Sequence, residues 1–174
     1  TLGYDDKPMK ILTLVRHAKS SWGDDSLSDR ERPLNARGER DAPVMGKRIV
    51  EHAIRPSLIL TSPAVRARTT ARIISRELNY PVEFLQSEDS LYHASLDDLL
   101  DTLVAQDSSF NSLMIVAHNP GLTDFANFLV PGLTNNLPTA GVVSVELQKD
   151  DWNLYERPSI KLLAYDYPKL AKSN

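Results

Sequence analysis

Histidine and arginine residues stand directly after three apolar runs of the sequence. The polar groups are residues 16–21 (RHAKSS), 62–66 (SPAVR) and 118–121 (HNPG). Arginine offers planar, bidentate donors to phosphate oxygens, and histidine can attack a phosphoryl group or donate a proton to it. Hydroxyls and the free backbone amides of helix starts also bind anions. If these groups meet in the fold, they describe an anion site, and in particular a phosphoryl site.

The elements that would position these groups alternate between strands and helices. Apolar runs predict six strands, four of them nearly continuous in apolar residues, as is typical of a sheet covered on both faces. Helical patterns fill most of the intervals, and Pro43 should kink the first helix or mark its true start. The alternation predicts a single-domain, three-layer α/β/α fold with a mostly parallel central sheet. Strands are expected at 10–15, 57–61, 82–85, 113–117, 142–147 and 160–165, and helices at 36–52, 64–78, 96–105 and 122–129.

The three polar groups are expected to converge on one crevice. They follow the predicted strands 10–15, 57–61 and 113–117, and ligands of an open parallel sheet bind outside the carboxyl ends of its strands. The nucleotide-binding patterns GxGxxG and GxxxxGK(S/T) are absent, which removes the commonest competing use of such a crevice. With no Cys and no clustered Asp and Glu ligands, neither a metal nor another cofactor is expected.

The composition is that of one ordinary globular domain. The 174 residues are 41% hydrophobic and 25% charged, and a chain of this length can bury a core without disulfides. The lack of cysteine excludes a disulfide framework and a thiol nucleophile, and a cytoplasmic location is expected. A net charge of −3 gives no overall attraction to nucleic acid or membrane, so neither is an expected partner. We expect an N-terminal extension or expression remnant at 1–8, the catalytic domain at 9–167 and a C-terminal tail at 168–174.

The polar groups also match a known family. Residues 14–18 (LVRHA) resemble the R-H-G signature of the histidine phosphatase (phosphoglycerate-mutase-like) superfamily. Residues 62–70 (SPAVRARTT) resemble its second motif and residues 116–119 (VAHN) its third. The motif at residues 32–38 (RPLNARG) and the short length of the chain most resemble the SixA branch, the phosphohistidine phosphatases. The resemblance covers nearly the whole chain from Met9 and implies a phosphoglycerate-mutase-like fold.

The resemblance implies that His17 is the nucleophile and that Arg16, Arg66 and His118 hold the transferred phosphoryl oxygens. Neighbouring arginines disfavour an imidazolium, so His17 should stay neutral and nucleophilic near pH 7. Its other ring N–H needs an acceptor, expected to be a backbone carbonyl, which fixes the tautomer. Further candidates for the phosphate-binding pocket are Ser20, Asn35 and Asn119.

The sequence departs from the family pattern at two points. Ala18 stands where the wider family usually has Gly, and R-H-A is common in short members. Mutase-like members carry a Glu or Asp that donates a proton, and residues 86–95 (QSEDSLYHAS) contain no clear counterpart. Glu88 is the first candidate for this general acid because it follows the predicted strand 82–85, and a solvated acidic turn is the alternative. Further candidates are Asp24, Asp29 and Asp89.

Several other polar and aromatic residues are expected to have structural roles. Arg68 lies on a different helix face from the motif arginine, where it is solvated or paired. His52 sits at a predicted helix end, where a cation suits the helix dipole. His93 either touches the rim of the crevice or is exposed. Trp22 and Trp152 are expected to pack rather than to contact a cofactor.

Together these observations predict a metal-independent phosphatase that works through phosphorylated His17. A phosphohistidine substrate has an imidazole leaving group that needs no strong acid, whereas an alcohol needs one. The lack of a clear acid therefore favours a phosphoramidate over a sugar phosphate, and the SixA resemblance implies phosphohistidine on a signalling protein, such as a histidine-containing phosphotransfer domain. A small-molecule phosphomonoesterase is one alternative, and a mutase is disfavoured because the short chain offers few loops to retain an intermediate. The other alternative is a non-catalytic module that binds a phosphorylated ligand. The presence of the motif histidines and arginines argues against it.

Overall fold

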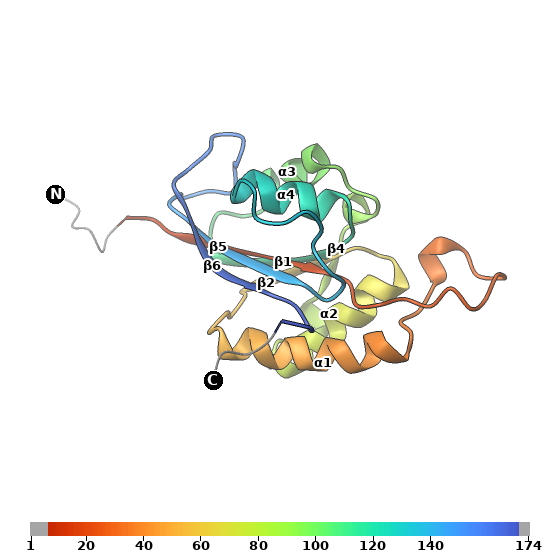
Figure 1. Cartoon of the computed structure of the whole chain (residues 1–174). Coiled ribbons are helices and arrows are strands. Elements are labelled where there is room, and N and C mark those ends of the chain that lie inside the picture. Colours follow the sequence, from red (N-terminus) through yellow and green to blue (C-terminus); the bar gives the residue numbers. More distant parts are fainter. Residues whose placement is uncertain (1–6, 171–174) are drawn as a thin grey trace.

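The computed structural model describes residues 7–170, which form a six-stranded sheet between two layers of helices (Figure 1). The order of strands in the sheet is β3-β2-β4-β1-β5-β6. Parts of the expected N-terminal extension and C-terminal tail, residues 1–6 and 171–174, lie outside the described residues. The strands are β1 (Lys10–Arg16), β2 (Leu58–Thr61), β3 (Gln86–Ser87), β4 (Ser112–Ala117), β5 (Val142–Leu147) and β6 (Ile160–Asp166).

The strands that precede the three polar groups are neighbours in the sheet. β4 lies between β1 and β2 and is parallel to both, and β2 is parallel to β3. Arg16 is level with Ala117, and Thr61 is level with Val116, so these three strands end together. β5 and β6 complete the sheet as antiparallel strands on the other side of β1. The residues that follow β1, β2 and β4 therefore meet at one edge, as the sequence predicts.

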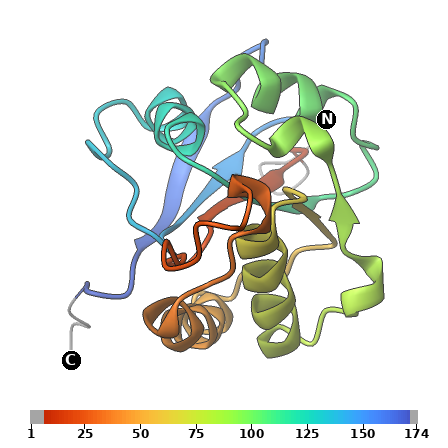
Figure 2. The same cartoon turned by 90° about the vertical axis from the view of Figure 1, so that its right-hand side faces the viewer.

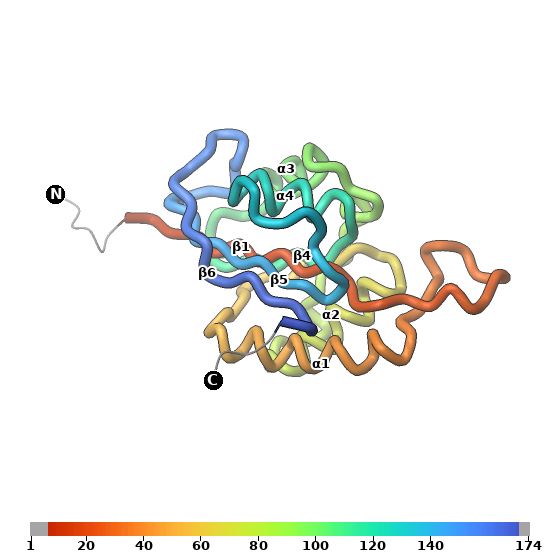
Figure 3. The backbone as a smooth tube through the Cα atoms, viewed as in Figure 1, coloured from red at the N-terminus to blue at the C-terminus, as the bar shows by residue number. Residues whose placement is uncertain are grey.

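Helices cover both faces of the sheet, as Figures 1 and 3 show. α1 (Ala36–Glu51) and α2 (Val65–Glu77) pack on one face, and α3 (Leu96–Val104) and α4 (Gly121–Leu129) on the other. The central strands are buried on both sides, which explains their continuous apolar runs. The predicted three-layer fold is confirmed.

Two local predictions need comment. The run at 82–85 is not a strand: Val82–Phe84 is a 3-10 helix, and the edge strand β3 follows it. Phe84 is 63% exposed, and its carbonyl accepts a hydrogen bond from the Tyr80 hydroxyl, so this apolar run is not buried within the sheet. Pro43 does not mark the start of α1, because the helix begins at Ala36 and continues through the proline.

Within residues 7–170, none of the helices combines the length and the apolar character needed to cross a membrane.

Candidate active site

Two histidines lie side by side at the carboxyl edge of the sheet. His17 follows β1 and His118 follows β4, and their ring centroids are 5.1 Å apart. Figure 2 looks onto this edge, where the segment after β1, the start of α2 and the segment before α3 surround the strand ends. Both histidines are buried, with His17 only 7% exposed. The fold therefore joins two sequence groups that are about a hundred residues apart.

The imidazole of His17 is held in one tautomer. Its Nδ1 lies 2.7 Å from the carbonyl oxygen of Ala18, which can only accept, so Nδ1 carries the hydrogen. The lone pair is then on Nε2, the nitrogen that can act as a nucleophile. This is the backbone acceptor expected from the sequence.

The neutral form of His17 is strongly favoured. The pKa of His17 is lowered from 6.5 to about 3, and burial is the largest cause. The hydrogen bond to Ala18 raises this pKa, and the positive charges of Arg66, Arg16 and Arg32 contribute to lowering it. The arginines expected to keep His17 neutral therefore contribute, but burial has the larger effect.

A threonine on α2 fixes the backbone next to His17. The Ala18 amide donates a hydrogen bond to Thr70 Oγ1 at 3.0 Å, and that hydroxyl donates to the Arg66 carbonyl at 2.8 Å. Arg66 and Thr70 are four positions apart, so they lie on the same helix face. The spacing of the second motif thus connects the first turn of α2 to the backbone that orients the His17 ring.

A glycine lets the loop after His17 approach α1. A Cβ at Gly38 would lie 2.1 Å from the carbonyl oxygen of Lys19, so only glycine fits this contact. The Asn35 side chain caps the same turn, because its Oδ1 accepts the Gly38 amide at 2.9 Å. Residues 32–38 therefore position the His17 loop, and Asn35 is a helix cap whose side chain is directed to α1.

Arg66 is buried and binds Asp29. One terminal nitrogen donates to the Asp29 carbonyl at 2.6 Å, and the other lies 3.0 Å from the Asp29 carboxylate. The carboxylate also accepts two hydrogen bonds from Arg32, at 3.1 and 3.0 Å. Burial by itself raises the pKa of Asp29, but hydrogen bonds from Tyr92, Arg32 and Arg66 outweigh it and hold this pKa well below its usual range. Asp29 is therefore an ionised acceptor.

His118 contacts Ser62, the first residue of the second motif. His118 Nε2 lies 2.7 Å from Ser62 Oγ, which also accepts the Ala64 amide. Burial, together with the charges of His17, Arg66 and His93, lowers the pKa of His118 to about 3, although Asp29 opposes this. A neutral His118 can donate one hydrogen bond to an oxyanion without adding a full charge.

Three buried nitrogens at this edge lack a hydrogen-bond partner among the described residues. They are Arg16 Nε, Arg66 Nε and His118 Nδ1. The Arg16 guanidinium is held by the Leu137 carbonyl through Nη1 at 2.9 Å. Buried polar groups are rarely left unpaired, and such groups gather at functional sites. Guanidinium N–H groups next to a nucleophilic imidazole suit a phosphoryl group.

A second cluster stands at the mouth of this site. Tyr92 donates its hydroxyl to Asp29 Oδ2 at 2.6 Å, and His93 Nε2 lies 3.4 Å from the same oxygen. The His93 ring is 6.1 Å from the His118 ring, and its side chain is 61% exposed. His93 thus lies at the rim and is also exposed, the two options expected for it, whereas the contact of Tyr92 with Asp29 is not predicted by the sequence. The leucine-tyrosine-histidine run at 91–93 carried no local signal for a contact with residue 29.

Ser20 and Asn119 have protein partners. Ser20 accepts a hydrogen bond from Arg32 Nη1 at 2.7 Å, so it orients an arginine that is paired with Asp29. Asn119 accepts from the Thr123 amide and hydroxyl and donates to Asn136 and Leu137. It thus ties the loop before β5 to the start of α4.

Glu88 lines a different hollow, together with Ser90, Asp98 and Asp101. Its amide donates to the Thr61 carbonyl. None of the histidines lines this hollow. The role of Glu88 as general acid stays a prediction.

The remaining residues fall outside the site. Arg68 is exposed on α2, and His52 follows α1 and pairs with Asp166 at 3.0 Å. Trp152 is buried in the core, as expected. Trp22 is not a packing residue: it is 72% exposed, with the Arg32 guanidinium 3.5 Å above its ring.

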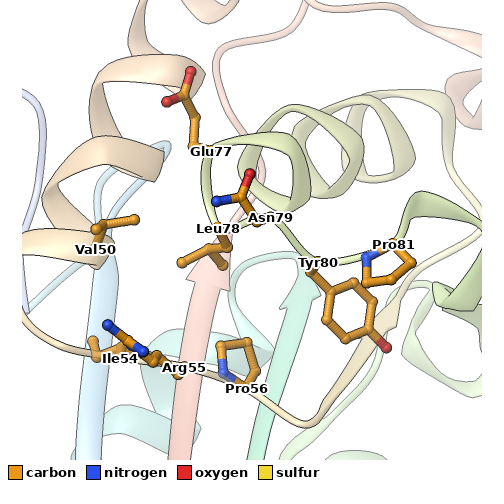
Figure 4. A pocket seen from close by; sticks show the side chains of 9 residues that line it. All are labelled: Val50, Ile54, Arg55, Pro56, Glu77, Leu78, Asn79, Tyr80 and Pro81. Atoms are coloured by element: carbon orange, nitrogen blue, oxygen red, sulfur yellow. The ribbon is translucent and has the colours of Figure 1, made fainter.

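Another hollow of about 360 Å³ lies at the opposite edge of the sheet. It is lined by Val50, Leu78 and Tyr80, among others, near the ends of α1 and α2 and the segment before β2 (Figure 4). It contains no histidine. In the described part of the chain, no group of three or more His, Asp or Glu side chains is placed to hold a metal ion.

The comparisons with known proteins agree with this geometry. The family model "Histidine phosphatase superfamily (branch 1)" matches residues 12–88. An uncharacterized chloroplastic protein of Arabidopsis thaliana is 30% identical over 151 residues, which cover 81% of this chain and 68% of that protein. The chain belongs to the histidine phosphatase superfamily. Membership in this superfamily supports phosphatase activity.

Within the superfamily, the fold is that of the SixA proteins. A protein of Agrobacterium tumefaciens assigned as the phosphohistidine phosphatase SixA superposes with a TM-score of 0.78 at 25% identity, over 91% of this chain and 98% of that one. A protein histidine phosphatase SixA in complex with tungstate gives a TM-score of 0.75 at 21% identity, over 91% and 97% of the two chains. The sequence resemblance to this branch is confirmed at the level of fold.

Proposed function

We propose that this chain is a metal-independent phosphatase that removes phosphoryl groups from phosphohistidine on a signalling protein and carries them on His17. Arg16, Arg66 and His118 hold the transferring oxygens. The observation that carries the proposal is the fixed tautomer of His17: its Nδ1 is bonded to Ala18, which leaves Nε2 as the nucleophile beside unpartnered guanidinium nitrogens. A cytoplasmic location and a histidine-containing phosphotransfer domain as partner belong to the same proposal.

The reaction has two steps. In the first, the Nε2 lone pair of His17 forms a bond to phosphorus while the bond from phosphorus to the substrate imidazole breaks. That imidazole leaves with the electron pair and is neutral, because its other nitrogen carries a proton. In the second step the oxygen of a water molecule bonds to the phosphorus on His17, the N–P bond breaks, and its electron pair returns to Nε2. Both protons of the water leave with the product as dihydrogen phosphate. Preorganised arginine donors stabilise the charge on the phosphoryl oxygens in both steps.

Two observations support phosphohistidine as the substrate. Solved structures with the same fold belong to proteins named as phosphohistidine or protein histidine phosphatases. The site also has ionised Asp29 at its mouth, and no protonated carboxyl group beside His17 is among the described contacts. An imidazole leaving group needs no such acid.

A phosphomonoesterase is the second candidate, and it is favoured by one observation. His93 stands at the mouth beside Asp29, and an imidazole can protonate an alcohol leaving group. A binding module without turnover is less well supported, because a site that only binds has no need of a neutral, oriented imidazole.

The test compares a histidine-phosphorylated phosphotransfer domain with a simple phosphomonoester, each with wild type and His17→Ala. We expect turnover of the phosphoprotein by wild type, loss of about 10³-fold or more in His17→Ala, and no change on adding EDTA. His52→Ala, which removes a histidine at the far end of α1, is the matched control. Retained activity in His17→Ala, or a loss in EDTA restored by a divalent metal, would overturn the proposed mechanism. Ester turnover without phosphoprotein turnover would select the second candidate.

A further inference from the structure

We propose that His93 is the proton donor and acceptor of this site, oriented by Asp29, and that it lets the enzyme hydrolyse phosphate esters of alcohols. The inference rests on the phosphoryl transfer to His17 proposed above. It assigns a catalytic group that the sequence motifs do not supply and adds a substrate class. The observation behind this inference is that His93, Asp29 and His118 lie together at the mouth of the site.

The position of His93 matches the direction in which a leaving group departs. In phosphoryl transfer the attacking and leaving atoms lie roughly in line. His17 is buried at the floor of the site, so a leaving group on a phosphate above it points outward. His93 is the exposed histidine at that outer side, and its ring is 6.1 Å from that of His118.

The contact with Asp29 gives His93 a defined orientation. His93 Nε2 lies 3.4 Å from Asp29 Oδ2, and its ring is 4.0 Å from that of Tyr92. Asp29 is itself held by Arg66, so its position is tied to the phosphoryl site. A carboxylate next to an imidazole restricts the orientation of the ring, as in other acid–base pairs.

The other titratable groups at the mouth are poorer proton donors. Asp29 is an ionised acceptor whose pKa lies well below its usual range. Burial and the hydrogen bond to Asp29 raise the pKa of Tyr92, whose hydrogen is directed at that carboxylate. Glu88 lines a different hollow. The charged or titratable groups that face His93 are Asp29, Tyr92, His118 and, behind Asp29, Arg66.

The backbone holds His93 in a conformation that most residues avoid. Its φ is 53°, in the left-handed region, and its neighbours Leu91 and Ala94 are buried anchors. A Cβ at Gly121 would lie 2.0 Å from the Ala94 carbonyl oxygen, so this glycine lets the segment pack directly against the start of α4. Residues kept in such sparsely populated conformations gather at functional sites.

The proton balance follows directly. As His17 Nε2 bonds to phosphorus, the ester P–O bond breaks, and the leaving oxygen takes the electron pair together with a proton from His93 Nδ1, the ring nitrogen that is not paired with Asp29. In the second step His93 Nδ1 accepts a proton from the attacking water. The oxygen of that water bonds to phosphorus, and the electron pair of the broken N–P bond returns to His17.

The test varies the leaving group in wild type and in His93→Asn. Asparagine tolerates the left-handed conformation, so this change keeps the backbone. Glycerol phosphate has a poor leaving group and p-nitrophenyl phosphate a good one. We expect kcat/KM for glycerol phosphate to fall by about 100-fold or more, and that for p-nitrophenyl phosphate to fall less than about three-fold. His52→Asn, which alters another histidine paired with an aspartate, should change neither.

A second variant separates proton transfer from a structural role. His93→Gly also suits the positive φ, and added imidazole should restore its hydrolysis of glycerol phosphate. Equal losses for both esters, no loss at all, no rescue, or a wild type without measurable hydrolysis of glycerol phosphate would overturn the inference. Retained activity in His17→Ala would instead refute the phosphoryl transfer on which it rests.

Discussion

Arg66 and Asp29 form a two-point contact across the mouth of the active site. Arg66 donates both to the backbone carbonyl and to the carboxylate of Asp29, at 2.6 and 3.0 Å. An arginine proposed to bind phosphate is therefore already paired with an anion from its own chain. The same carboxylate orients His93, so Asp29 links phosphate binding to proton transfer.

Replacing Asp29 with asparagine should strengthen the binding of inorganic phosphate. The change removes a negative charge next to the bound anion and keeps the shape of the side chain. We expect the inhibition constant of phosphate to fall about five-fold, equivalent to ~1 kcal/mol, and hydrolysis of glycerol phosphate to slow as His93 loses its partner. Asp166→Asn, at a carboxylate paired with Arg48 and His52, is the control. Unchanged or weaker phosphate binding would contradict the inference that Asp29 and phosphate compete for Arg66.

Thr70→Val should lower turnover without unfolding the protein. The Thr70 hydroxyl fixes both the Ala18 amide and the Arg66 carbonyl, so its loss loosens the backbone that orients His17. We expect kcat to fall about 10- to 100-fold with a smaller change in KM, and Thr70→Ser to recover most of it. Thr102→Val removes a similarly buried hydroxyl on α3 and should leave kcat unchanged. Equal kcat values for Thr70→Val and wild type would show that this bond does not position His17.

The stability of the protein should fall as the pH drops below 6.5. The pKa values of His17 and His118 are lowered from 6.5 to about 3, so between these limits the unfolded chain binds protons that the native protein does not. Within this window each histidine therefore lowers the free energy of unfolding by up to ~1.4 kcal/mol for each pH unit of acidification, and above it by nothing. Between pH 6.5 and pH 5, the free energy of unfolding measured in urea should fall by about 1–2 kcal/mol less in His17→Gln than in wild type. Identical losses would mean that His17 is protonated in the native state.

Gly121→Ala should destabilise the protein and displace the segment that carries His93. The added Cβ would lie 2.0 Å from the Ala94 carbonyl oxygen, and neither is a flexible side-chain end. We expect the free energy of unfolding to fall by about 2 kcal/mol or more, measured in urea. Gly23→Ala, where a Cβ meets only Ser21 Oγ at 3.5 Å, should change it by less than about 0.5 kcal/mol. A stable Gly121→Ala variant would show that α4 and this segment can move apart.

The sequence predicted the sheet and the convergence at its edge because those features depend on local patterns. Apolar runs followed at once by polar groups mark strands and their carboxyl ends, and parallel strands bring such ends together. The error at 82–85 shows the limit of this reasoning. A short apolar run has the same sequence pattern whether it forms a strand or an exposed turn. Only its packing in the folded protein distinguishes the two.

The contacts of Asp29 with Arg66, Tyr92 and His93 could not be predicted from the sequence, for a different reason. These residues are far apart in the chain, and no periodicity connects them. Asn35 and Asn119 show the converse problem. Their positions near the motifs suggested phosphate contacts, yet their side chains satisfy backbone amides and carbonyls, which asparagine does as readily as it binds a ligand.

The place of β4 in the sheet has a consequence for synthesis of the chain. β1 and β2 precede it in the sequence but do not touch each other in the sheet, and only β4 inserted between them brings the two together. A nascent chain that has left the ribosome up to about residue 110 therefore carries His17 and Arg66 after two strands, β1 and β2, that have no common partner. His17 and Arg66 can therefore be held together only after residues 112–118 have emerged and β4 has joined β1 to β2.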